Sequence, residues 1–241
     1  MTRLVFFSTL SLFFIMALLP FRMQVWTDYG HPYIAREQEH YYACLSELEQ
    51  LKNNGADEKK VHMAMLKVAK SLAVLRRYQP ADRIYSEVWQ ARSKSTLAYD
   101  ETFVSAVMGL AALRRDTSNI AGAINCYSIA LEYDKKHLTA GDVRLVRDKT
   151  NLAVALLIAG KTAKTAEKKL FYQRPAAGFL AEAIAELKQR HPQGSVREAN
   201  ARQDLAYVLK DMGDKEGYKK EMAFADGLKR KLNLASLCRE P

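Results

Sequence analysis

The chain reads Ala-Asp-Arg-Ile-Tyr-Ser-Glu-Val-Trp at residues 81–89 and Ala-Ile-Asn-Cys-Tyr-Ser-Ile-Ala-Leu at residues 123–131. The alanine, the tyrosine and a small apolar residue of each stretch fall three or four positions apart, which is the spacing of one helix face. Both stretches therefore predict the same amphipathic helix. The matching pairs, each 42 residues apart, are Ala81 and Ala123, Tyr85 and Tyr127, and Val88 and Ala130.

Acidic residues follow the same period at the points where helices are expected to begin. Asp57, Asp100 and Asp142 each stand at the end of a short polar segment, at intervals of 43 and 42 residues. An aspartate there can accept hydrogen bonds from the free amides of the first helical turn and suits the positive end of the helix dipole. A fixed period of this size is typical of a stacked array of helices.

Apolar periodicity predicts a first helix over residues 33–53, and helix pairs after it. The third pair is expected to turn at Gly160-Lys161, and Gln173-Arg174-Pro175 is expected to break the chain before another amphipathic helix. Gly160 and Gly213, the two turn glycines, are 53 residues apart, so about 11 residues are inserted relative to the period.

The end of the chain predicts two more helices. Ser195 is expected to cap the first, and Glu198, three residues later, would complete a capping box. After a turn at residues 211–214, the final helix runs from about Lys215 to Lys231. It is polar and rich in lysine, as a terminal helix of an array must be.

Small residues and an aromatic recur at corresponding positions of the pairs, and this pattern resembles the tetratricopeptide repeat. The spacing, longer than is usual in that family, is similar to the kinesin-light-chain type, and the resemblance covers about residues 58–233. It implies an all-α fold, a right-handed α-α superhelix (tetratricopeptide-like solenoid). The uncharged residues 4–21 are expected to precede this solenoid as an N-terminal hydrophobic helix. The residues that carry the resemblance are Ala69, Ala81, Tyr85, Val88, Ala123, Tyr127, Ala130, Ala153, Gly160, Ala206 and Gly213.

The resemblance implies a protein-interaction scaffold that holds an extended partner segment in a concave groove lined by the first helix of each pair. In related arrays an asparagine just before a Leu-Ala pair bonds the peptide backbone, and Asn151 matches that position. Basic residues near the groove, Lys149 among them, favour an acidic partner. The candidate groove residues are Lys67, Arg147, Asn151, Arg202 and Asp204.

Residues 4–21 contain no charge and lie between Arg3 and Arg22. As a helix they would extend about 27 Å, close to the thickness of a hydrocarbon core. An uncleaved signal-anchor is favoured because residues 17–19 make a poor cleavage site, and a cleaved signal or a buried soluble helix are the alternatives.

The expected organisation follows from these segments. A signal-anchor or signal peptide occupies residues 1–23, an N-terminal helix or linker 24–56, the repeat domain 57–233 and a C-terminal tail 234–241. We expect the repeat domain to lie outside the cytoplasm, anchored to a membrane through residues 4–21, or secreted or periplasmic after cleavage.

The net charge of +10 is concentrated in the second half, with +2 over residues 1–142 and +8 over residues 143–241. This half could bind anionic surfaces, or it could be a solvated helix surface. Its aromatic residues do not interleave with lysines, which argues against nucleic acid as a partner. A structural subunit of an envelope complex is the other alternative to a scaffold.

Catalysis finds no support in the sequence. The five histidines lie in separate segments without metal-ligand spacing, and no phosphate loop or nucleophile motif is present. We therefore expect neither an enzyme nor a cofactor or metal. The three cysteines, Cys44, Cys126 and Cys238, are widely spaced, which is typical of small apolar core residues.

Overall fold

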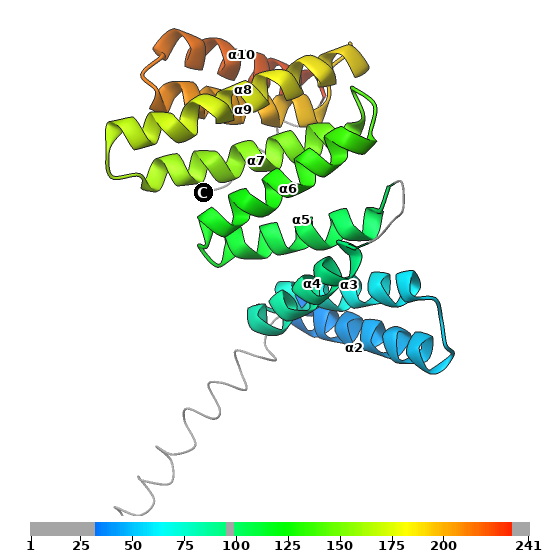
Figure 1. The fold of residues 1–241 in the computed structure, drawn as a ribbon. Coiled ribbons are helices and arrows are strands. Elements are labelled where there is room, and N and C mark those ends of the chain that lie inside the picture. The colour runs from blue at the N-terminus through cyan, green and yellow to red at the C-terminus, as the bar shows by residue number, and fades with distance from the viewer. Residues whose placement is uncertain (1–31, 95–98, 233–241) are drawn as a thin grey trace, which may run out of the picture. The chain divides into compact units, whose positions relative to one another are not determined.

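The computed structural model describes residues 32–94 and 99–232, and within these ranges its secondary structure is entirely helical (Figure 1). No helix in the described ranges combines the length and the apolar character needed to cross a membrane. The hydrophobic segment predicted over residues 4–21 lies outside them. The helices are α2 Pro32–Asn53, α3 Glu58–Val74, α4 Tyr78–Arg92, α5 Glu101–Asp116, α6 Ile120–His137, α7 Val143–Thr162, α8 Ala166–Arg190, α9 Val196–Asp211 and α10 Lys215–Lys231.

The three periodic aspartates cap helices as predicted. Asp57 accepts a hydrogen bond from the amide of Lys59 at 2.9 Å at the start of α3. Asp100 accepts from two amides at the start of α5, and Asp142 accepts from one amide at the start of α7. Each cap satisfies donors that the first helical turn leaves free, which stabilises a helix by about 1 kcal/mol.

The chain divides into two compact units, residues 1–84 and residues 85–241. In the first unit α2 and α3 run antiparallel. His40 lies 2.9 Å from Ser71, and Glu47, further along α2, pairs with Lys67, which stands earlier on α3. Buried apolar side chains on these two helices include Cys44, Leu48, Ala64, Met65, Val68, Ala69 and Leu72.

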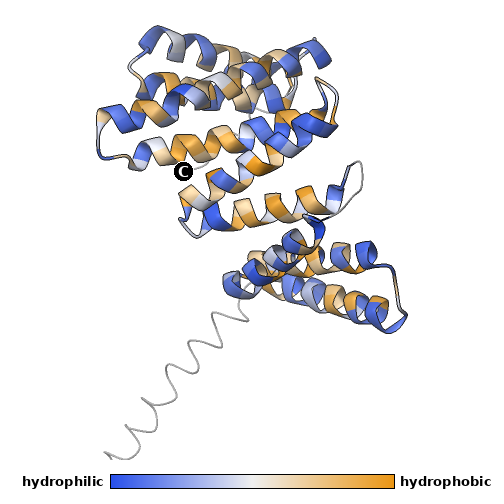
Figure 2. Cartoon of the chain, in the orientation of Figure 1, coloured by the Kyte–Doolittle hydropathy of each residue, from blue (hydrophilic) through white to orange (hydrophobic). Residues whose placement is uncertain are grey.

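In the second unit each helix from α5 to α10 packs on the next, and α7 also contacts α9 (Figure 1). Contact between the first helices of successive pairs is the arrangement that stacks a helical array. Figure 2 shows long hydrophobic stretches on α5 and α7, whereas α10 is mostly hydrophilic. Fully buried alanines let the helix backbones approach closely: Ala106, Ala111, Ala123, Ala130, Ala153, Ala155, Ala183 and Ala206.

The turn predicted at Gly160-Lys161 is wrong, because both residues belong to the last turn of α7 and the chain turns at residues 163–165. Gly160 instead allows close packing between two helices. A Cβ atom at this position would come within 3.2 Å of Cγ of Gln173 on α8. The missing side chain lets α8 pass close to α7 instead of turning the chain.

The break predicted at Gln173-Arg174-Pro175 is also wrong. α8 continues through Pro175 as one helix of 25 residues, against 18 in α6. A proline inside a helix leaves one carbonyl without its donor and costs stability. Here buried side chains on both sides of the proline, Ala176 and Leu180 after it and Gln173 before it, hold the helix against its neighbours. Most of the inserted residues therefore lengthen α8 rather than form a further helix.

The capping box predicted at the start of α9 forms only in part. Ser195 accepts from the amide of Glu198 at 3.1 Å, as expected. The Glu198 carboxylate, however, is buried and accepts from Arg202 at 2.9 Å. Arg202 lies four residues later on the same helix and offers a charged donor, so the carboxylate takes this partner.

Candidate functional site

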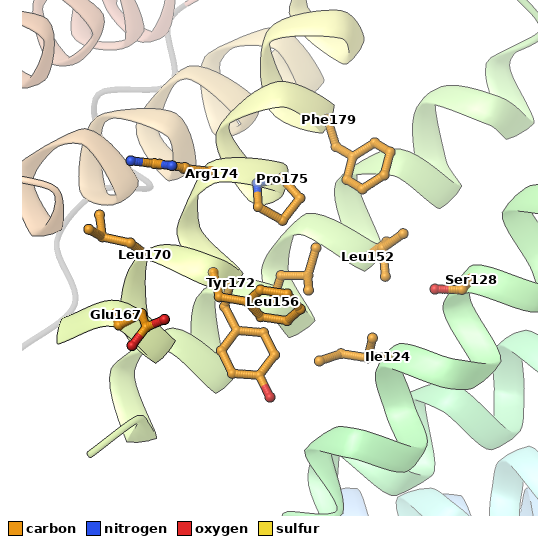
Figure 3. A pocket seen from close by; sticks show the side chains of 11 residues that line it. Ile124, Ser128, Leu152, Leu156, Glu167, Leu170, Tyr172, Arg174, Pro175 and Phe179 are labelled. Atoms are coloured by element: carbon orange, nitrogen blue, oxygen red, sulfur yellow. The ribbon is translucent and has the colours of Figure 1, made fainter. Parts of the chain in front are cut away.

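An open pocket of about 780 Å³ lies between α6 and α8, with α7 as its floor (Figure 3). The α6 side contributes Ile124 and Ser128, and the floor consists of Leu152 and Leu156. Figure 3 shows Tyr172, Pro175 and Phe179 of α8 on the other side. The remaining lining residues are Glu167, Leu170, Phe171 and Arg174.

The pocket exists because α6 and α8 both pack on α7 and leave a gap over it. The floor leucines, four residues apart, lie on one face of α7. Phe171 stands at the edge with 70% of its surface exposed, which is unusual for a phenylalanine. Such an edge, beside an apolar hollow, is typical of a surface that another molecule covers.

A second hollow of about 440 Å³ adjoins the first, and Ile124 and Tyr172 line both. It extends towards the start of α6 and α8, where Ile120, Thr165 and Lys168 line it. Together the two hollows form one seam, defined here as the α6–α8 seam, which runs along both helices.

The predicted contact Asn151 and its neighbour Arg147 lie together on the partly exposed face of α7, one turn apart. Leu152 stands five residues after Arg147, and Leu156 stands five residues after Asn151. Five residues correspond to a rotation of about 140° around the helix axis. The α6–α8 seam is therefore on a different side of α7 from the predicted contacts. Arg147 is already bound within the chain, since its guanidinium donates to Asp148 at 2.8 Å.

Two other predicted residues, Arg202 and Asp204, lie on α9 on different sides. Arg202 lies between α9 and α10, where it pairs with Glu198 and with Glu221 at 2.6 Å. Asp204 is partly buried, and this burial raises the pKa of its carboxyl while Lys161 and Lys229 oppose the shift.

Lys67 belongs to the first unit, where it pairs with Glu47 at 2.6 Å. Lys149, expected near the groove, is buried against α8 and pairs with Glu182 and Glu186. Both lysines thus form ion pairs between helices of this chain. Among the five candidates the structure brings together only Arg147 and Asn151 on one helix face.

Solved structures with the same arrangement of helices carry tetratricopeptide-like repeats. A substituted form of a putative kinesin light chain from Podosopora anserina, with nearly identical TPR-like repeats, has a TM-score of 0.67 at 11% identity, over 88% of this chain and 95% of that chain. The fold is the tetratricopeptide-like repeat.

A second structure of the Podosopora anserina repeats gives a TM-score of 0.65 at 11% identity, over 91% of this chain and 97% of the other. BtubC (BKLC) from P. vanneervenii gives 0.56 at 13% identity, over 85% and 94%. No family model matches this chain, and no curated protein sequence does. The prediction of a kinesin-light-chain type of tetratricopeptide-like fold is therefore confirmed by structure rather than by sequence.

Sequence reasoning missed the α6–α8 seam. By their spacing Ile124 and Leu156 belong to the apolar faces of their helices, and these faces are expected to be covered in a repeat array. The exposed Phe171, and Pro175 inside a helix longer than its counterpart, are the structural features that mark the seam.

Proposed function

We propose that this protein is a non-enzymatic scaffold that binds another protein through its tetratricopeptide-like repeats. The pocket between α6 and α8 carries the proposal. It offers about 780 Å³ of mainly apolar space with an exposed aromatic edge. Apolar surface of this kind gains free energy when it leaves water, by roughly 25 cal/mol per Å² buried. A partner that inserts apolar side chains would draw its affinity from this term.

We also propose that residues 4–21 hold the repeats beside a membrane, with the repeat domain outside the cytoplasm. The length of this uncharged segment and the arginines at its two ends support the proposal. If the segment is cleaved as a signal, the repeats would be secreted or periplasmic instead.

The exposed face of α7 that carries Arg147 and Asn151, here called the first-helix face, is a further proposed contact for the same partner. Asn151 is partly exposed on α7, where its amide can bond a peptide backbone. Arg147, one turn away, is exposed but already pairs with Asp134 and Asp148. Lys67, Arg202 and Asp204 remain proposed contacts, although Lys67 and Arg202 already hold ion pairs within the chain.

The test is affinity capture of the full chain from detergent-solubilised membranes. Wild type is compared with Phe171→Ser at the pocket edge and with Phe224→Ser on α10, where the phenylalanine is also exposed. We expect one protein to co-purify in fixed ratio and to be lost with Phe171→Ser alone. Equal recovery with both variants would show that the pocket does not bind the partner.

Two more variants separate the remaining parts of the proposal. Deletion of residues 1–31 should release the chain from the membrane fraction and leave capture intact. Asn151→Ala, which leaves Arg147 in its pairs with Asp134 and Asp148, should weaken capture if the α7 face that carries Asn151 contributes. Capture of acidic material alone, lost at high salt in every variant, would favour a basic surface over a scaffold.

A further inference from the structure

We infer that the α6–α8 seam binds an acidic amphipathic helix of the partner protein. The inference rests on the proposed function, and it adds the chemistry and the secondary structure of the segment that docks there. Three properties of the seam carry it: its length, the apolar character of its floor, and the charge along its α8 side.

The seam has the length of a short helix. It runs from Thr165, the N-cap of α8, to Phe179, and the fourteen helical residues 166–179 extend about 21 Å. On its other side Ile120 to Ser128 of α6 follow in the same direction. A space bordered by two helices that run in the same direction, with a third helix below, is the shape that a further packed helix fills.

The floor favours a helix over an extended peptide. Leu152 and Leu156 offer no hydrogen bonds, and the opposite walls are mainly Ile124, Phe179 and Pro175. An extended segment would bury backbone amides and carbonyls against these side chains without partners, which is costly. A helix satisfies its backbone internally and presents side chains three and four residues apart to the two hollows.

The charge along the seam is positive. Lys164 and Lys168 line the second hollow and Arg174 lines the first, whereas Glu167 is the one acidic side chain among the described residues that line either hollow. The positive end of the α8 dipole lies at the same place. Acidic side chains on a docked helix would meet three cations and one anion.

These three cations are available to a partner. Within residues 32–94 and 99–232 none of Lys164, Lys168 and Arg174 forms an ion pair, and all three are exposed. By contrast, Lys149 and Arg202 are held by glutamates of this chain. The positive charge at the seam is therefore left over after the fold has satisfied its own pairs.

A synthetic peptide provides the probe. It has about 18 residues, with leucines three and four positions apart on one face, glutamates elsewhere and a photoreactive leucine analogue at its centre. A second peptide replaces the glutamates by lysines, and a third keeps the glutamates but replaces the leucines by serines. Each is crosslinked to the full chain in a non-ionic detergent, and the crosslinked residues are mapped by mass spectrometry.

We expect the acidic leucine peptide to crosslink to α6 and α8 at residues of the seam, at least tenfold more than either of the other peptides. The variant Lys164→Glu/Lys168→Glu/Arg174→Glu should lose at least tenfold in affinity for it and should gain affinity for the lysine peptide. The control, Lys215→Glu/Lys220→Glu/Arg230→Glu on α10, changes the net charge equally and should bind like wild type.

Other outcomes overturn the inference. If the lysine peptide crosslinks as well as the acidic leucine peptide, the partner helix does not need to be acidic. If the serine peptide crosslinks equally well, the seam binds through charge and not through its apolar floor. Crosslinks between two copies of the chain at the seam would replace the partner helix by self-association. If no peptide binds but a protein is still captured through Phe171, the inference fails and the proposed function stands.

Discussion

Asp134 on α6 and Asp148 on α7 are both fully buried, and they share one arginine. Nε of Arg147 lies 2.8 Å from Asp148, and its Nη2 lies 3.5 Å from Asp134, which also accepts from the Tyr99 hydroxyl at 3.1 Å. Burial raises the pKa of Asp148 to about 7, the Asp134 carboxylate adds to the shift, and Arg147 opposes it. One cation cannot balance two buried carboxylates, so Asp148 keeps its proton below this pH.

This pair predicts that stability falls as pH rises. The folded chain holds a proton on Asp148 that the unfolded chain releases, so the free energy of unfolding decreases between about pH 4 and about pH 7 and is then constant. Asp148→Asn mimics the protonated acid and should flatten this dependence, with a gain of about 1–3 kcal/mol at pH 8. Thermal unfolding of wild type and variant from pH 5 to pH 8 measures this pH dependence. The same pH dependence of the melting temperature in both proteins would contradict the prediction.

Asp100 should contribute more to the free energy of unfolding than Asp57, although both residues cap helices. Burial alone would raise the pKa of Asp100, but hydrogen bonds from Arg92 and from the first amides of α5 hold it below its usual value. Asp100→Ala removes the carboxylate that pairs with Arg92 at 2.6 Å and should cost about 3–5 kcal/mol.

The matched variant, Asp57→Ala, removes only a cap and should cost about 1 kcal/mol. Urea unfolding of both variants gives the comparison. Equal losses would mean that the Arg92–Asp100 pair adds nothing beyond the cap.

Gly109 on α5 lies directly under the ring of Tyr85, and a Cβ atom there would overlap the ring. Gly109→Ala should therefore destabilise the second unit by about 1–3 kcal/mol, because Tyr85 is buried and cannot move aside freely. Gly178 in α8 has open space around it, so Gly178→Ala should stabilise by up to about 1 kcal/mol. Opposite shifts in melting temperature are expected, and shifts of the same sign would be evidence against this packing.

Pro175 should be replaceable at no cost to the fold. Pro175→Ala restores the missing amide inside α8 and should raise stability by about 1–3 kcal/mol with no loss of helical circular dichroism. Pro80, in the first turn of α4, occupies a position where the amide has no partner, so Pro80→Ala should change stability by only about 0.5 kcal/mol. A loss of helix in Pro175→Ala would show that the proline is needed where it stands.

The sequence predicted what depends on neighbours along the chain. Asp57, Asp100 and Asp142 cap helices because their side chains act on amides two or three residues away. The repeat period and the fold followed from these signals. The end of α7 and the continuity of α8 did not follow from the sequence. Gly160 and Pro175 are typical turn residues, but packing between helices overrides that local preference.

The α6–α8 seam could not be predicted for a related reason. Whether Ile124 or Leu156 is covered depends on the distance between α6 and α8, and no pattern within either helix encodes that distance. The same holds for Arg202, whose partner Glu221 lies on a helix further along the chain. Periodicity could therefore assign the candidate residues to helices, but it could not predict the direction in which each side chain points.

The added length of α8 has a consequence for how such an array can change. Because α8 packs on α7 and also on α9, its buried side is tied to the next pair as well as to its own. Natural selection can therefore rewrite the exposed side of this helix freely, whereas changes on its buried side would also move α9. A chain built this way can acquire a new binding preference in one helix while it inherits the rest of its architecture unchanged.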